Sequence, residues 1–216
     1  MDLQSAVIVS EIIAFILGVV YYKKYFNTNL KYFLFLLGIM LSIELFYTFI
    51  TDVLDERIEN NTAVYNLLSV LEFCTYFFIY YSFSKKIRHR KIIFFIGVFY
   101  LLSVIINFSF FQKLSSTGSF HLYTYAIGAL LLVVVIGLYI IEILKSDEVL
   151  HIKKSLLFWI SSGLLIYYVG VLPFWIGLPF IPESELKNAS YILFSLSIIM
   201  YSCFIFGFIW SKRLST

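Results

Sequence analysis

Long apolar runs separated by short charged gaps form the dominant pattern of this chain. Seven windows of 18 to 24 residues are almost free of charge, and such lengths cross a hydrocarbon core of about 30 Å at about 1.5 Å per helical residue. Inside lipid every backbone polar group needs an internal partner, and the runs lack the alternation of a membrane strand. The pattern therefore predicts an all-α polytopic membrane protein, a bundle of seven transmembrane helices that forms one domain over residues 1–216. The expected helices span about 5–22, 31–51, 62–84, 91–111, 121–144, 154–177 and 188–211.

Composition supports this class. Hydrophobic residues make up 61% of the chain, charged residues only 13%, and the mean hydropathy is +0.93. An ordinary soluble domain is about half apolar and about one quarter charged. The expected connections are too short to hold a soluble domain.

The Lys and Arg residues are distributed unevenly between the two sides of the predicted membrane. Of the 16, all but three fall after the first, third and fifth windows or in the C-terminal tail. Short loops rich in Lys and Arg stay in the cytoplasm, so we expect the N-terminus outside, the C-terminus inside and a bacterial inner-membrane location. The same rule accounts for the net charge of +3, which therefore gives no support for nucleic-acid binding. The three on the other side are Arg57, Lys113 and Lys187.

The densest basic cluster follows the third window and consists of Lys85, Lys86, Arg88, Arg90 and Lys91. It could dock anionic lipid headgroups or an acidic cytoplasmic partner, since each basic residue contributes about 1 kcal/mol near an anionic surface. The positive-inside effect alone would also place such a cluster here. The sequence favours this simpler interpretation, a topology anchor.

Acidic residues inside the windows are the chemically unusual groups. A carboxylate at a helix centre costs about 2.5 to 3.5 kcal/mol, so such residues are rare and usually face the bundle interior. Glu11, Glu44 and Glu72 fall in the outer half of the first three predicted helices. Glu142 lies near the inner end of the fifth helix, where we expect it to reach the membrane interface and play no part in a site.

The third predicted helix carries a polar stripe. Tyr65, Ser69, Glu72, Tyr76 and Tyr80 are spaced four, three, four and four apart, which is one helical face. Hydroxyl groups within reach of a carboxylate can hydrogen-bond to it. This predicts a polar cavity, open to the outside, that binds a small cationic or polar ligand or exchanges a proton. The alternative is interhelical hydrogen bonding worth about 0.6 kcal/mol per pair. The candidate ligand- or proton-binding residues are Glu11, Glu44, Glu72, Tyr47, Asn66, Ser69 and Tyr76.

Small residues recur along the sixth predicted helix. Gly163, Gly170 and Gly177 are seven apart, and small residues on one face let a neighbouring helix approach closely. We expect them to pack against another helix.

Several familiar activities are disfavoured by missing residues. A retinal protein needs a Lys in its last helix, and 188–211 contains none. The three His residues, His89, His121 and His151, fall near the ends of the windows, not in the convergent sets that zinc requires. We therefore expect no enzyme activity, no cofactor and no metal.

Short motifs resemble those of one group of proteins. Tyr65-Asn66, Leu71-Glu72-Phe73, Tyr76, Phe78 and Phe158-Trp159 are similar to motifs of small bacterial seven-transmembrane-helix proteins of unassigned function, which are often encoded near two-component kinases. The resemblance implies a sensory role and carries over no catalytic residues.

Two functional hypotheses follow. In the first, the chain is a membrane sensor or signal-transducing module with an outward-facing polar cavity, acting through a cytoplasmic signalling protein. In the second, it is a small-solute or proton-coupled transporter. Transporter sites usually use broken helices at matched positions of two repeats. The acidic triplet has no counterpart in the second half of the chain, so the sequence leans toward the sensor. Membrane lipids are expected partners, and the sequence leaves a homo-oligomer open.

Overall fold

The computed structural model describes residues 3–53, 62–111, 122–177 and 186–212. It is 91% helical, and no strand occurs in these residues. Seven of the described helices are long and apolar enough to cross a membrane, so the chain is a multi-pass helical membrane protein. Their bounds are α1 Leu3–Val20, α2 Lys31–Val53, α3 Thr62–Phe83, α4 Ile87–Ile106, α5 Leu122–Leu144, α6 Leu156–Gly177 and α7 Leu186–Trp210.

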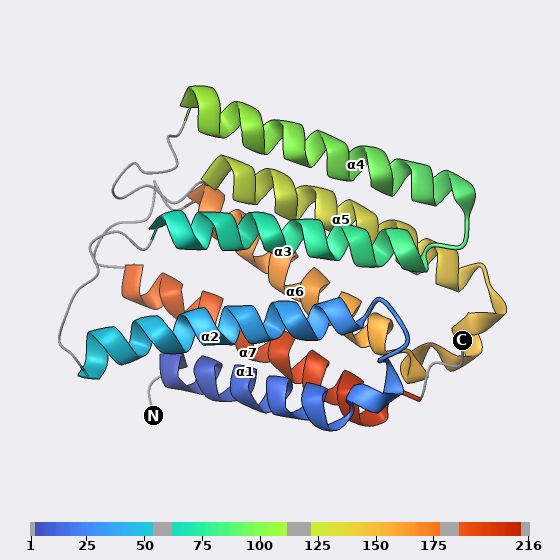
Figure 1. Ribbon diagram of the computed structural model, residues 1–216, viewed down its shortest axis with the longest axis horizontal. Coiled ribbons are helices and arrows are strands. Elements are labelled where there is room, and N and C mark those ends of the chain that lie inside the picture. The colour runs from blue at the N-terminus through green and yellow to red at the C-terminus, as the bar shows by residue number, and fades with distance from the viewer. Residues whose placement is uncertain (1–2, 54–61, 112–121, 178–185, 213–216) are drawn as a thin grey trace.

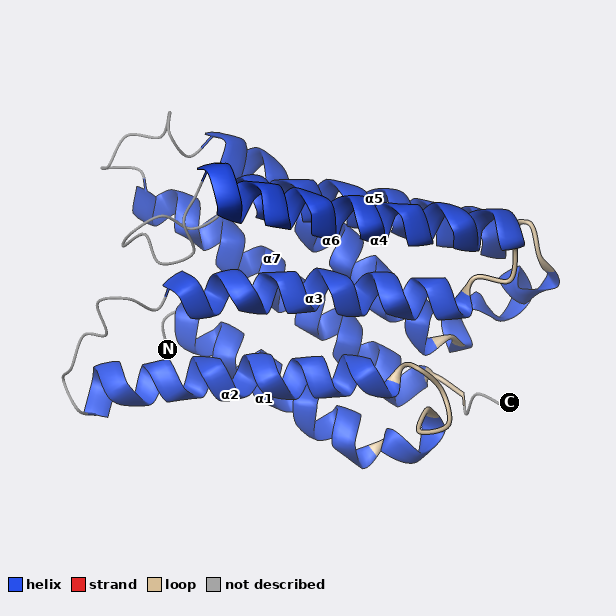
Figure 2. Cartoon of the chain, turned by 45° about the horizontal axis from the view of Figure 1, so that its top comes forward, coloured by secondary structure: helices blue, strands red, loops and turns tan. Residues whose placement is uncertain are grey.

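The helices lie side by side in one bundle. Each helix packs on the next in the chain, and α7 returns to pack on α1. The two views agree that α3 lies between α1 and α2 on one side and α4 and α5 on the other (Figures 1 and 2). Helix α7 packs on both α6 and α1. Side chains of α3 and α6 also bond to one another directly. The middle of the bundle is therefore where residues from both halves of the chain meet.

The links 21–30, 84–86 and 145–155 and the end of α7 gather at one end of the bundle (Figure 1). We call this the basic end, since the Lys residues of these links lie there. Lys24 Nζ donates hydrogen bonds to the carbonyl oxygens of Phe208 and Ile209, each at 2.9 Å. Loss of water around this amino group lowers the pKa of Lys24. The contact satisfies carbonyls in the last turn of α7, where a cation is favourable.

Helix α4 differs most from the prediction. It begins at Ile87, four residues before the predicted start at residue 91, so Arg88, Arg90 and Lys91 lie in its first turns. Charged residues end an apolar window but do not end a helix, and this explains the difference. At its other end α4 continues as a π-helical turn, Asn107–Phe111, and Asn107 Nδ2 donates to Thr124 Oγ1 of α5 at 2.7 Å.

Glycine determines how closely α6 and α7 approach. A Cβ built on Gly163 would lie 2.9 Å from the backbone oxygen of Met200, and one on Gly170 would lie 2.6 Å from Leu196. The predicted packing role therefore holds for these two residues. A Cβ built on Gly177 would meet nothing within 4 Å in the described part of the chain, so no described residue makes the predicted close approach there.

Gly163→Ala should lower the free energy of unfolding by about 1–3 kcal/mol, because the backbone of α7 must move to admit the methyl group. Unfolding of the purified protein by SDS titration in mixed micelles would measure this. Gly137→Ala is the matched control, since nothing lies within 4 Å of a Cβ there. Helix propensity should stabilise the control by up to about 1 kcal/mol. Equal stabilisation of both variants would contradict the close approach.

Candidate functional site

We call Glu11 on α1, Glu44 on α2 and Glu72 on α3 the carboxyl cluster, and Glu11 lies at its centre because it interacts with both of the others. Glu11 is only 1% exposed. The carboxyl group interacts with the carboxyl of Glu44 on α2, the hydroxyl of Tyr201 on α7 and, electrostatically, with Glu72. Neither oxygen makes a hydrogen bond of ordinary distance and angle to any described residue. A buried carboxyl in this state has lost its water without full replacement, which is energetically unfavourable.

Glu72 is better satisfied. It is 9% exposed on α3, and the hydroxyl of Tyr168 on α6 donates to Glu72 Oε1 at 2.8 Å. The hydroxyl of Tyr76, one turn along α3, is also within hydrogen-bonding reach of the carboxyl. The polar stripe inferred from spacing on α3 thus faces the interior of the bundle at its centre.

The remaining candidates lie closer to the end opposite the basic end. The ring of Tyr47 on α2 stacks on that of Tyr65 on α3, with centroids 5.5 Å apart, and Tyr65 interacts with both Glu44 and Glu11. Ser69 is buried, but its hydroxyl donates to the backbone oxygen of Asn66 on its own helix at 2.8 Å. The residue Asn66 is itself 1% exposed.

Sequence reasoning missed the tyrosines of the second half of the chain. Besides Tyr168 and Tyr201, the hydroxyls of Tyr125 on α5 and Tyr167 on α6 bond to each other, and Tyr167 also reaches Ser197 on α7. The sequence does contain an indication of this network: tyrosines, whose hydroxyl groups need a partner, occur in the middle of apolar helices where Phe would fill the same space.

Further hydroxyl pairs continue from the cluster toward the basic end. Tyr80, the last member of the α3 stripe, lies 2.7 Å from the hydroxyl of Ser161 on α6. Tyr139 on α5 and Ser155 beside α6 follow, with hydroxyls 3.5 Å apart. The polar groups of the interior thus extend beyond the carboxyls.

No described basic side chain lies on the central part of a helix. Helices α1, α3, α5 and α6 contain no Lys, Arg or His, and those of α2, α4 and α7 are confined to the first turns. Carboxylates repel one another, and the repulsion is stronger in an apolar medium than in water. The described part of the bundle therefore places three carboxyls near one another without a cation from the chain between them.

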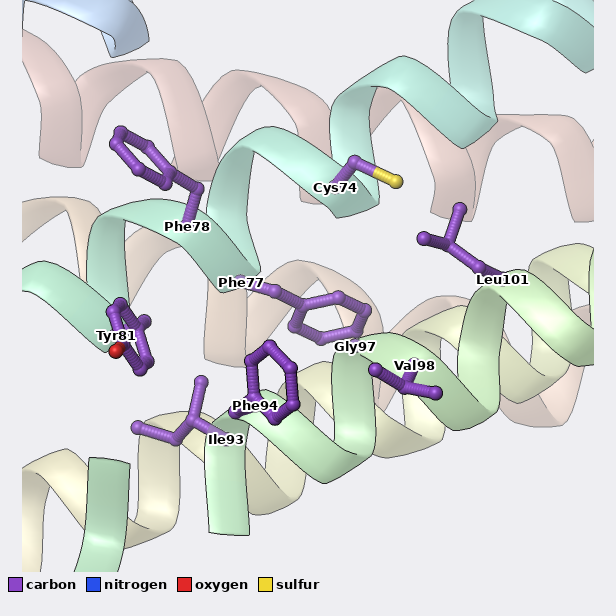
Figure 3. A pocket seen from close by; sticks show the side chains of 9 residues that line it. All are labelled: Cys74, Phe77, Phe78, Tyr81, Ile93, Phe94, Gly97, Val98 and Leu101. Atoms are coloured by element: carbon purple, nitrogen blue, oxygen red, sulfur yellow. The ribbon is translucent and has the colours of Figure 1, made fainter. Parts of the chain in front are cut away.

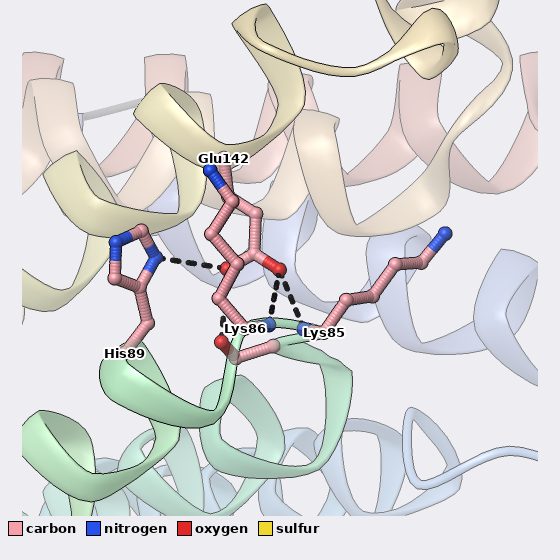
Figure 4. A network of polar contacts seen from close by, with 5 residues as sticks. Lys85, Lys86, His89 and Glu142 are labelled. Carbon is pink, nitrogen blue, oxygen red and sulfur yellow. Dashed lines mark hydrogen bonds and ion pairs between the residues drawn. The ribbon is translucent and has the colours of Figure 1, made fainter.

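Glu142 lies near the end of α5, at the basic end of the bundle, and is 9% exposed. Its carboxylate accepts hydrogen bonds from the link that leads into α4 (Figure 4), so that it makes structural contacts which the sequence did not predict. Its Oε1 accepts the backbone N–H groups of Lys85 and Lys86, the latter at 3.0 Å. Its Oε2 accepts the hydroxyl of Ser84 and lies against His89 Nδ1, both at 2.9 Å. A carboxylate at this position accepts hydrogen bonds from backbone N–H groups at a helix N-terminus, and its negative charge interacts favourably with the helix dipole.

The predicted headgroup or partner cluster lies next to this network. The side chains of Lys85, Lys86, Arg88 and Lys91 are exposed at the basic end. Arg90 is half-buried, with its guanidinium carbon 4.7 Å from the centre of the Tyr81 ring. Four of the five basic side chains are therefore exposed at the surface, whereas Arg90 packs against α3.

Two described cavities lie away from the carboxyls. One of about 350 Å³ runs between α3 and α4, and one of about 660 Å³ runs between α1 and α2. The predicted chamber open to the outside stays a prediction. In the described residues no three His, Cys, Asp or Glu side chains are arranged to hold a metal ion.

Comparison of the chain with protein-family models, with curated proteins and with solved structures found no match. The resemblance to small bacterial seven-helix proteins stays a prediction.

Glu142→Gln should lower the free energy of unfolding by about 1–3 kcal/mol. The amide places a donor where the carboxylate accepted one, which leaves buried polar groups unpaired. Denaturant unfolding in detergent would measure the change. Lys145→Gln, an exposed change three residues further on, is the control and should have little effect. Equal stability of Glu142→Gln and the native chain would contradict a role for the carboxylate in fixing α4.

Proposed function

We propose that the protein is an integral membrane sensor in which Glu11, Glu44 and Glu72 bind a positive charge, as a proton or a small organic cation, from the outer side. In this proposal the protein lies in a bacterial inner membrane. The N-terminus lies outside, and the basic end faces the cytoplasm in accordance with the positive-inside rule. The signal passes there to a separate cytoplasmic protein.

One observation carries the proposal: the carboxyl of Glu11 is buried beside two other carboxyls and no described basic side chain shares the interior with them. Carboxylates that have lost their water repel each other strongly. A positive charge bound between them relieves both the repulsion and the lost hydration. Ionisable groups inside a membrane protein mark binding sites and proton paths more often than structural contacts.

Binding at this position would bias the packing of several helices. The cluster takes carboxyls from α1, α2 and α3, and hydroxyls from α6 and α7. A ligand changes a conformational equilibrium only by binding one arrangement more tightly. A charge that draws the three carboxyls together does this, since it favours closer contact among α1, α2 and α3.

A proton-coupled transporter is the second candidate. The hydroxyl pairs Tyr80–Ser161 and Tyr139–Ser155 favour it, because they continue from the carboxyls toward the basic end. Such hydroxyls both donate and accept protons. A transporter would use them as part of a path, whereas a sensor needs them only for packing.

Glu72→Gln and Glu11→Gln should each weaken binding by about tenfold or more, since a bond to a charged group is worth about 1.5–3 kcal/mol. Infrared difference spectra of the purified protein across a pH step, and titration with small organic cations, would measure this. Tyr168→Phe should weaken binding less, because only one donor to Glu72 is lost. Tyr22→Phe, on the link after α1, is the matched control. Unchanged binding in both Glu variants would overturn the site.

Liposome reconstitution with a pH-sensitive dye would separate the two functions. If the protein is a sensor, we expect no saturable flux. We also expect a cytoplasmic protein to co-purify with the native chain, but not with a variant in which Lys85, Lys86, Arg88 and Lys91 are replaced by Gln. Saturable flux that Glu72→Gln abolishes would instead establish transport and contradict the sensor.

A further inference from the structure

The groove between α3 and α4 is formed by two facing stripes. Cys74, Phe77, Phe78 and Tyr81 line it from α3. Ile93, Phe94, Gly97, Val98 and Leu101 line it from α4. Figure 3 shows Phe77 of α3 and Phe94 and Val98 of α4 between the two helices, while the ring of Phe78 is turned away from α4. The spacing of three and four residues on each helix makes each set one helical face.

The groove is open toward the lipid and has not been filled by the chain. Phe77 and Ile93, 4% and 2% exposed, form its floor, while Phe78 and Phe94 on its rim are about half exposed. Gly97 widens it, since a Cβ placed there would meet nothing within 4 Å. In a membrane, such a surface is covered by lipid unless another protein covers it.

A cation lies where the α4 stripe reaches the basic end. Arg90 is three residues before Ile93 and continues the same face. Its guanidinium rests on the ring of Tyr81, which itself lines the groove. The Nε of Arg90 is buried and makes no hydrogen bond within the described part of the chain. A buried donor on a charged group without an acceptor is energetically unfavourable, and an anion at the mouth that drew the guanidinium outward would give it an acceptor.

The described carboxylate beside the start of α4, that of Glu142, already has hydrogen-bond partners. Glu142 accepts hydrogen bonds from the start of α4 and lies against His89. The N-terminus of α4 is therefore neutralised by the chain itself, and the described residues supply no acceptor for the Nε of Arg90.

The dimensions match one leaflet of a bilayer. Arg90 and Leu101 are eleven residues apart, which is about 16 Å along a helix, and half of a hydrocarbon core is about 15 Å. The occupant must therefore combine an anionic group at the basic end with an apolar chain one leaflet long. We propose that this groove is a binding site for an anionic phospholipid, with one acyl chain between α3 and α4 and the phosphate on Arg90. The site is independent of the carboxyl cluster and of the function proposed for it.

Native mass spectrometry of the full chain, released from detergent micelles with phosphatidylglycerol and phosphatidylcholine of identical chains, tests this. We expect phosphatidylglycerol to bind about tenfold more tightly than phosphatidylcholine. Arg90→Gln should weaken phosphatidylglycerol binding by about tenfold, as expected for loss of a charge-assisted bond. Arg88→Gln, an exposed charge on the same helix, should weaken it by about fivefold at most, the effect of one surface charge.

Filling the groove tests the position of the chain. Gly97→Phe should weaken binding of both lipids, and Gly137→Phe, equally open on α5, should not. If the Gly97→Phe variant does not fold, Val98→Trp, on the rim of the groove, is used in its place. Equal effects of Arg90→Gln and Arg88→Gln would overturn the proposal, because they indicate a diffuse basic surface. So would equal binding of the two lipids, unchanged binding when the groove is filled, or equal competition by glycerol phosphate, which has no acyl chain.

Discussion

The absence of water from the membrane interior is the constraint on which this structure depends, because each polar group must find its partner within the chain. Serine hydroxyls bond back to carbonyls on their own helices, as Ser42 and Ser202 do at 2.7 Å. Glu72 takes the Tyr168 hydroxyl. Glu11 and the Nε of Arg90 are described groups that lack such a bond. One is an acid and the other a base, and they lie at different depths, so they call for different occupants.

Length and hydropathy are local properties, and they were sufficient to predict the number, type and approximate bounds of the seven helices. The start of α4 could not be placed in this way. The backbone N–H groups of Lys85 and Lys86, directly before α4, bond to Glu142, which is more than fifty residues further on in the chain. The contacts of Glu142 could not be predicted for the same reason. Its position near a helix end was visible in the sequence, but the donors that bond to it were not.

The candidate site could be predicted in part for the same reason. The stripe on α3 follows from spacing within one helix, and depth placed Glu11 and Glu44 at a similar level. Which helices face each other is not encoded locally, so the contributions of Tyr168 and Tyr201 appeared only once α6 and α7 were seen beside α3 and α1. Ser69 shared the stripe, yet its hydroxyl bonds to its own helix. A polar residue on the correct face still has a choice of partner.

The division of labour between the two halves of the chain bears on mechanism. The first three helices supply carboxyls, whereas α6 and α7 supply hydroxyls that meet them from the other side. A carboxyl that gains a positive charge becomes a weaker acceptor, so its bond to a tyrosine weakens at the same time. The bond between Tyr168 on α6 and Glu72 on α3 would respond in this way. It joins the two halves of the chain, so one binding event at the carboxyls would alter their packing without any broken helix. This favours an arrangement that reports binding over one that requires two matched transport repeats.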